Sequence, residues 1–185
     1  MKLLCKYVVL LFLVSAQFSF AQKLTRKEKK ILKTIEANNN EAIEFLKDVV
    51  NINSGTMNHD GVKEVGDVFG KAFEDIGFKS SWYNMSQVNR SGHLFAETSG
   101  NKGKKLLLIG HLDTVFEENS PFQEFKMVND SIAHAPGGND MKGGNVIILY
   151  ALKALKENGL LEDAQIIAAF TGDEEASGKP ISISR

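Results

Sequence analysis

Two short apolar segments stand out in the second half of the chain. Leu106–Ile109 is wholly apolar and Gln165–Phe170 almost so, which predicts two buried strands. Asn145–Asn158, between them, is predicted to be a helix because apolar residues recur at helical spacing. A helix joining two buried strands predicts an α/β fold, a three-layer sandwich with a mixed, mostly parallel sheet covered by helices on both faces. The predicted inward face of the helix consists of Ile147, Ala151, Ala154 and Leu155.

The rest of the pattern predicts further helices and strands. Thr25–Val50 is expected to be helical in two pieces broken at residues 38–40, and a second helix is expected over His59–Ile76. The turn residues at 100–103 predict that His93–Thr98 forms a hairpin with Lys104–Ile109. The other predicted strands are Phe78–Met85, Phe122–Met127 and Ser131–Ala133.

The first residues have the pattern of a secretory signal peptide. Lys2 and Lys6 precede the apolar run Tyr7–Val14, and Ser19-Phe20-Ala21 provides small residues for cleavage. The run is shorter than the roughly 20 residues that span a bilayer. We therefore expect residues 1–21 to be removed, which predicts a secreted or periplasmic protein without a membrane anchor.

Composition narrows the class of protein further. The 185 residues are 43% hydrophobic and 24% charged, with a formal net charge of -1, and no basic patch favours nucleic acid. The only cysteine, Cys5, lies in the predicted signal peptide. The mature chain therefore offers no disulfide, no thiol nucleophile and no thiolate ligand.

Imidazole and carboxylate groups follow each of the two predicted buried strands or open the predicted helix. His111 and Asp113 come at the end of one strand, Asp140 comes before the helix, and Glu174 and Glu175 follow the other strand. Sites in open α/β sheets gather outside the carboxyl ends of the strands, so we expect these groups to lie close together. Asp113 can orient the His111 ring, since residues two apart in a strand share a face.

One imidazole with several carboxylates suits Zn²⁺ or another divalent first-row metal. One carboxylate can bridge two ions about 3.5–4 Å apart. Of two adjacent glutamates, one can bind a metal while the other faces the water that the metal activates and carries its proton to a leaving amine. This chemistry predicts hydrolysis of an amide bond.

Three motifs resemble a known family. Gly-His-Leu-Asp-Thr-Val at 110–115, Pro-Gly-Gly-Asn-Asp-Met-Lys-Gly-Gly at 136–144 and Thr-Gly-Asp-Glu-Glu at 171–175 are similar to the N-terminal signatures of a co-catalytic zinc metallopeptidase family. That family includes glutamate carboxypeptidases, aminoacylases, dipeptidases, acetylornithine deacetylase and succinyl-diaminopimelate desuccinylase. Among these, the chain most resembles the secreted glutamate carboxypeptidase-like branch.

The resemblance implies a zinc exopeptidase-like fold and a role for each motif residue. His111 and Glu175 would each bind one of two zinc ions, and Asp140 would bridge them, with a cis peptide to the next residue. Asp113 would hold His111 in place, and Glu174 would be the general acid/base. Cobalt or manganese could replace zinc. The implied substrate is a small peptide or an N-acyl amino acid, and the family pattern allows for a homodimer of the full-length protein.

The chain also departs from the family pattern. His134-Ala135 stands where the family has an aromatic residue and a glycine, and His134 is expected to support the site without binding metal. His59 and His93 are expected on the surface and in a strand, respectively. The family's last acidic and histidine ligands and its lid or dimerisation domain have no counterpart. We therefore expect residues 22–185 to be the N-terminal portion of a catalytic domain, weakly active or inactive alone. The alternative is a non-catalytic, metal-binding relative of the same fold.

Overall fold

The computed structural model describes residues 23–178, so the predicted signal peptide and the last seven residues lie outside the described part. Among the described residues, no helix is both long and apolar enough to cross a bilayer. The first helix, α2, spans Arg26–Val50. Thr25 and Glu28 cap its start, because the backbone N–H of each donates to the side chain of the other. Residues from Ile31 onward form one compact unit, which contains the sheet, most of α2 and the other helices.

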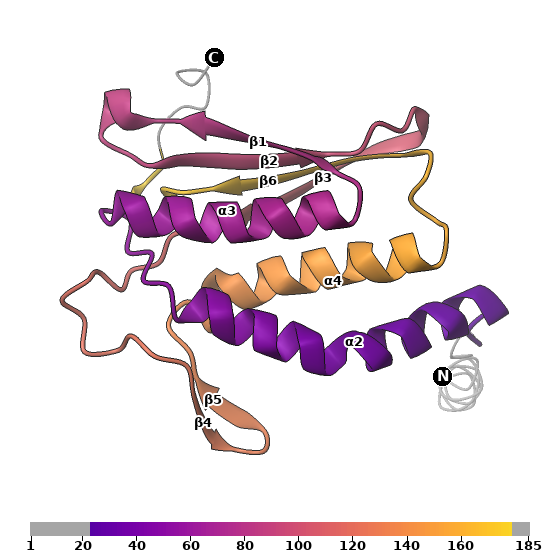
Figure 1. The fold of residues 1–185 in the computed structure, drawn as a ribbon, viewed down its shortest axis with the longest axis horizontal. Helices are drawn as coiled ribbons and strands as arrows, with labels where there is room; N and C mark the ends of the chain where they lie inside the picture. The colour runs from indigo at the N-terminus through magenta and orange to yellow at the C-terminus, as the bar shows by residue number, and fades with distance from the viewer. Residues whose placement is uncertain (1–22, 179–185) are drawn as a thin grey trace, which may run out of the picture. The chain divides into compact units, whose positions relative to one another are not determined.

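A four-stranded sheet forms the framework, in the order β1-β2-β6-β3 (Figure 1). β1 pairs with β2 and β2 with β6 in antiparallel fashion, whereas β3 and β6 are parallel. The mixed sheet is as predicted, but two of its three pairings are antiparallel, so it is not mostly parallel. The strands are β1 (Lys79–Asn84), β2 (Gly92–Glu97), β3 (Lys102–His111) and β6 (Ala164–Thr171).

The predicted hairpin between the second and third strands is wrong. β6 lies between β2 and β3 and pairs with both. The physical reason is burial: β6 is the most apolar strand and is largely buried, whereas the first half of β3 is exposed and carries three lysines. Lysines suit the edge of a sheet, where they discourage pairing with another chain.

Within the described residues, three α-helices accompany the sheet. α2 runs as one helix through residues 38–40, without the predicted break. α3 spans His59–Asp75, and α4 spans Gly143–Glu157 and makes the crossover from β3 to β6. β4 (Lys126–Asn129) and β5 (Ile132–His134) form a separate hairpin; β5 lies within one residue of its predicted bounds, whereas β4 begins four residues later than predicted.

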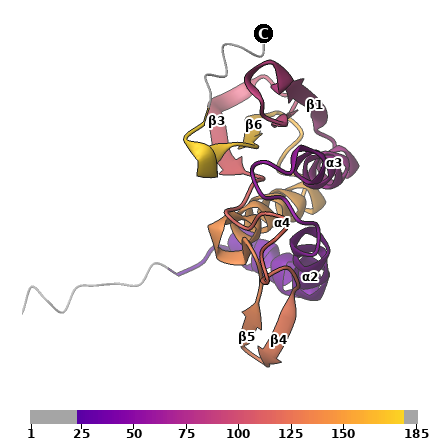
Figure 2. The ribbon, with the colours of Figure 1, turned by 90° about the vertical axis from the view of Figure 1, so that its left-hand side faces the viewer.

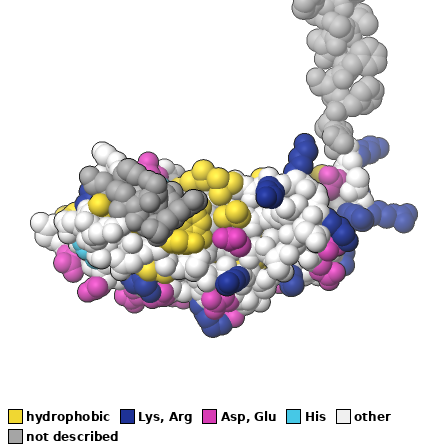
Figure 3. Space-filling model, turned by 90° about the horizontal axis from the view of Figure 1, so that it is seen from above, with side chains coloured by type: hydrophobic (Ala, Val, Ile, Leu, Met, Phe, Trp, Pro, Cys, Tyr) yellow, Lys and Arg dark blue, Asp and Glu magenta, His cyan; other side chains and the backbone are white. Residues whose placement is uncertain are grey.

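The helices lie on one face of the sheet (Figures 1 and 2). α3 packs against β1 and β2, and α4 packs against β3. Within residues 23–178 no helix covers the opposite face, where Leu107 and Ile109 of β3 are 56% and 65% exposed. Figure 3, seen from the sheet side, shows hydrophobic side chains gathered there. The prediction of helices flanking a mixed sheet is confirmed. Helices were expected on both faces of the sheet, but those of residues 23–178 lie on one face only.

Aromatic rings fill the space between the sheet and the helices. Phe170 of β6 makes edge contacts with Phe69 and Phe73 of α3, with ring centroids 5.5 and 5.6 Å apart. Phe45 of α2 contacts both Phe69 and Tyr150 of α4 in the same way. These fully or largely buried rings fix β6 against the helices, and β6 leads directly into the third motif.

The face that α4 presents to this core overlaps the predicted one only in part: Ala154 is buried and Leu155 packs against the core, but Ala151 is exposed. Ile147 is 72% exposed, whereas Val146, Leu149 and Tyr150 are buried. The buried residues follow i, i+3, i+4 spacing from Val146, so the inward stripe is centred one position earlier.

Paired truncations in α4 test this orientation. Leu149→Ala should lower the free energy of unfolding by about 2–5 kcal/mol, because it leaves a cavity in the core. Ile147→Ala should change it by less than about 0.5 kcal/mol, as expected at a surface site. Chemical denaturation of both variants measures the difference, and equal losses would contradict the orientation.

Candidate metal centre

The candidate site lies where β3 and β6 end side by side. The two strands are parallel, and their register pairs His111, the last residue of β3, with Thr171, the last residue of β6. The first and third motifs therefore leave the sheet at the same edge, as sites in open α/β sheets do. Gly110 allows the crossover helix to approach, since a Cβ there would lie 2.1 Å from Asn145 Oδ1.

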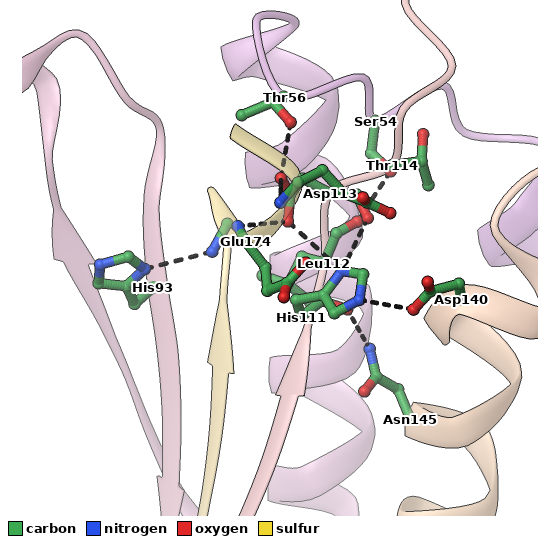
Figure 4. A network of polar contacts seen from close by, with 12 residues as sticks. Ser54, Thr56, His93, His111, Leu112, Asp113, Thr114, Asp140, Asn145 and Glu174 are labelled. Carbon is green, nitrogen blue, oxygen red and sulfur yellow. Dashed lines mark hydrogen bonds and ion pairs between the residues drawn. The ribbon is translucent and has the colours of Figure 1, made fainter. Parts of the chain in front are cut away.

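Asp113 joins three loops at this edge (Figure 4). Its fully buried carboxylate accepts a hydrogen bond from the Thr56 hydroxyl at 2.6 Å and from the backbone N–H groups of Glu174 and Glu175, both at 3.1 Å. Burial alone would raise the pKa of Asp113, but the hydrogen bonds from His111, Thr56 and Glu175 outweigh it and lower the pKa. Asp113 therefore stays ionised and fixes the backbone of the third motif.

The His111 ring is held from both sides. Its Nδ1 lies 3.1 Å from the Asp113 carbonyl oxygen and 3.5 Å from Asp113 Oδ1, so it faces acceptors only. Its Nε2 lies 3.0 Å from Asp140 Oδ1. Burial would lower the pKa of His111, but the two carboxylates outweigh it and raise the pKa to about 9. A ring that keeps its proton on Nδ1 presents Nε2 to a metal, which is the usual arrangement of a histidine ligand.

The second motif brings Asp140 to His111 from an irregular turn, Gly138–Lys142. Gly137 precedes it in the left-handed region, at φ 68°, and a Cβ there would lie 2.4 Å from Thr114 Cγ2. The peptide bond from Asp140 to Met141 is cis, as the family resemblance implied.

Lys142 anchors this turn. Its side chain is buried, and its Nζ donates to the carbonyl oxygens of Val49 and Ile52, both at 2.8 Å, just where α2 ends. Burial lowers the pKa of Lys142 to about 7. The turn that carries Asp140 is thus tied to the C-terminal end of α2.

The third motif completes a group of potential ligands. One ligand atom each from His111, Glu174 and Glu175 lies within 4.8 Å of the others. Asp140 is not in this group, but its Oδ1 lies within hydrogen-bond distance of His111 Nε2. Burial raises the pKa of Glu175, and the carboxylates of Asp140, Asp113 and Glu174 raise it further, against the opposing effect of His111. The site therefore has an excess of negative charge.

The donor atoms fit a divalent metal such as zinc. They are one imidazole nitrogen and several carboxylate oxygens, which are the ligand types of zinc sites. His111, Asp140 and Glu175 are the residues that would hold it.

The fold brings together all five residues predicted from the motifs. It also adds residues that sequence reasoning missed. Thr56 binds Asp113, and Asn145 Nδ2 donates to the His111 carbonyl oxygen at 2.6 Å (Figure 4). Asn145 could have been noticed as a polar residue in the apolar helix, whereas nothing in the sequence near Thr56 points to a residue 57 positions later.

The other histidines lie outside the group of potential ligands. His93 is buried in β2, as the strand prediction expected, and its Nδ1 accepts a hydrogen bond from the Gly172 N–H at 3.2 Å. Burial lowers the pKa of His93. It thus supports the start of the third motif. His134 is exposed in β5, where its ring contacts Phe122.

Comparison with known proteins identifies the pattern. Residues 107–183 match the model of Peptidase family M20/M25/M40. The chain resembles this peptidase family. The resemblance predicted from the three motifs is therefore confirmed. Carboxypeptidase G2 from Pseudomonas sp. (strain RS-16) is 30% identical over 158 residues, which are 83% of this chain and 34% of that protein.

Solved structures show the same fold. Human carnosine dipeptidase 1 matches with a TM-score of 0.70 and 20% identity over 80% of this chain and 35% of its own. The M20 family metallo-carboxypeptidase Sso-CP2 from Sulfolobus solfataricus matches with a TM-score of 0.61 and 22% identity over 73% and 31%. The chain thus spans about a third of the length of these relatives.

The raised pKa of His111 predicts a pH-dependent stability of the metal-free protein. The pKa is about 9 in the folded state against an ordinary value of 6.5, so the charged ring stabilises the fold fully below pH 6.5. This stabilisation is lost as the pH rises through about 9. The difference in unfolding free energy between wild type and His111→Asn should therefore shrink, by on the order of 3 kcal/mol.

Urea denaturation in a chelator at a series of pH values measures this difference. The comparison with His111→Asn removes contributions of other titrating groups, including Lys142. A difference that stays constant across this pH range would contradict the ion-pair geometry around His111.

Proposed function

We propose that the protein containing this chain is a zinc-dependent exopeptidase or amidohydrolase of the glutamate carboxypeptidase type. The observation that carries the proposal is the convergence of His111, Glu174 and Glu175 at the edge of the sheet, with ligand atoms within 4.8 Å of one another. A buried, ionised Asp113 fixes the backbone of both glutamates. Such a rigid support is what a metal site needs.

Each residue of the candidate metal centre has a distinct proposed role. His111 and Glu175 would each hold one metal ion, and Asp140 would contribute its carboxylate to both. Zinc, when bound, acts as a Lewis acid that lowers the pKa of its water toward about 7. Glu174, which is exposed beside the ligands, takes a proton from the attacking water and delivers it to the leaving amine. Asp113 is a positioning residue that keeps the His111 ring oriented.

The remaining proposals concern the whole protein. We propose that residues 1–21 direct export and are removed, so that the enzyme acts as a secreted or periplasmic protein on small peptides or N-acyl amino acids. Residues 22–185 would then be the N-terminal portion of its catalytic domain.

A non-catalytic metal-binding protein of the same fold is the alternative. The presence of Glu174 beside the ligands favours the enzyme, because binding a metal requires Glu175 but gives no reason for a second carboxylate that faces the same space.

Glu174→Gln separates catalysis from metal binding. In the full-length protein it should lower kcat by about 10²–10⁴-fold, since it removes the proton carrier, and leave the zinc content unchanged. Glu175→Gln is the matched control and should lower both the zinc content and the activity. Peptidase assays with elemental analysis of the same samples measure both quantities.

Two results would contradict this assignment. Full activity of Glu174→Gln would refute its role as the general base. Loss of zinc from Glu174→Gln would show instead that it is a ligand, which its distance from His111 also allows.

A further inference from the structure

A cavity of about 320 Å³ opens directly beside the candidate metal centre. Asp140 and Glu175 line it on one side, so these two residues belong both to the cavity and to the group of acidic residues around His111. Its volume lies in the range of about 300–1,000 Å³ that small-molecule sites occupy. The other lining residues are Val115, Phe116, Phe122, Ala135, Gly137 and Asn139.

The wall away from the carboxylates is aromatic and ordered. The rings of Phe116 and Phe122 meet edge to face, with centroids 5.0 Å apart, and His134 packs on Phe122 at 6.1 Å. Such pairs hold both rings in defined positions. The apolar wall is therefore formed before any ligand arrives.

Hydrogen bonds fix the loop that carries these rings. Asn53 Nδ2 donates to the Phe116 carbonyl oxygen at 2.8 Å and to Gln123 Oε1 at 2.7 Å. Gln123 Nε2 in turn donates to the carbonyl oxygens of Glu117 and Ser120, at 2.8 and 2.9 Å. A preorganised loop binds a ligand at a lower entropic cost than a mobile one.

The side chains that line the cavity offer no cationic partner to an acidic group. Among the described residues that line it there is no lysine or arginine, and both charged lining residues are carboxylates. An acidic side chain would find no cationic side chain among the lining residues, whereas an apolar group would gain the aromatic wall.

We propose that this cavity is a specificity pocket that receives an apolar side chain or acyl group of the substrate, up to about the size of a phenyl ring. The inference rests on the proposed function, because the scissile bond must lie at Asp140 and Glu175 for the adjacent group to reach Phe116 and Phe122.

Hydroxamates with different tails test the pocket, because the hydroxamate group chelates the metal and the tail probes the space beside it. Calorimetric titration of the zinc-loaded full-length protein should give a Kd for phenylacetohydroxamate about tenfold or more below that for acetohydroxamate. The monohydroxamate of succinic acid, with an acidic tail, should bind no more tightly than acetohydroxamate.

Phe122→Ala should reduce the advantage of the phenyl tail to less than about threefold and leave the Kd of acetohydroxamate unchanged, which also shows that the variant is folded. Phe125→Ala is the matched control, because Phe125 is a half-buried aromatic residue of the same loop that does not line the cavity. It should keep the full advantage.

The outcomes distinguish the two proposals. Equal Kd values for the phenyl and methyl tails in wild type, or a phenyl advantage that survives Phe122→Ala, would overturn the pocket and leave the metal site standing. Failure of every hydroxamate to bind would overturn the metal site itself, and the pocket with it.

Discussion

The buried carboxylate of Asp113 is the interaction on which the site depends. It accepts hydrogen bonds from the Thr56 hydroxyl in the loop before α3 and from the backbone N–H groups of Glu174 and Glu175 in the loop after β6. Its own backbone carbonyl oxygen lies against His111 Nδ1. An ionised group without exposure to water is tolerated only when it is paired and hydrogen-bonded, so these loops and Asp113 require one another.

The surplus of negative charge at this site favours the binding of a cation. Asp113 is compensated by hydrogen bonds and by His111, but Asp140, Glu174 and Glu175 add three more carboxylates around a single imidazole. The buried Lys142, two residues after Asp140, is engaged with the carbonyl oxygens of Val49 and Ile52. A divalent cation would compensate the surplus negative charge, and the apolar cavity next to it would then give a hydrolase its selectivity.

Local patterns were sufficient to predict the helices, the strands and the residues that gather at the site. Leu106–Ile109 and Gln165–Phe170 are short apolar runs that the first and third motifs follow directly, and α4 has helical periodicity and is preceded by the second motif. The order of the strands was mispredicted, because a short turn favours a hairpin locally, whereas burial of β6 between β2 and β3 is a property of the whole sheet. Thr56 and Lys142 act across more than 50 residues of sequence, which no local pattern reveals.

The central claim is that His111, Asp140 and Glu175 hold a metal ion. A crystal structure of the zinc-loaded protein, with anomalous diffraction measured on both sides of the zinc absorption edge, tests it most directly. The account predicts an anomalous peak within about 2.0–2.2 Å of His111 Nε2 and of a carboxylate oxygen of Asp140. Absence of a peak there, or a peak bound only by residues outside the three motifs, would contradict it.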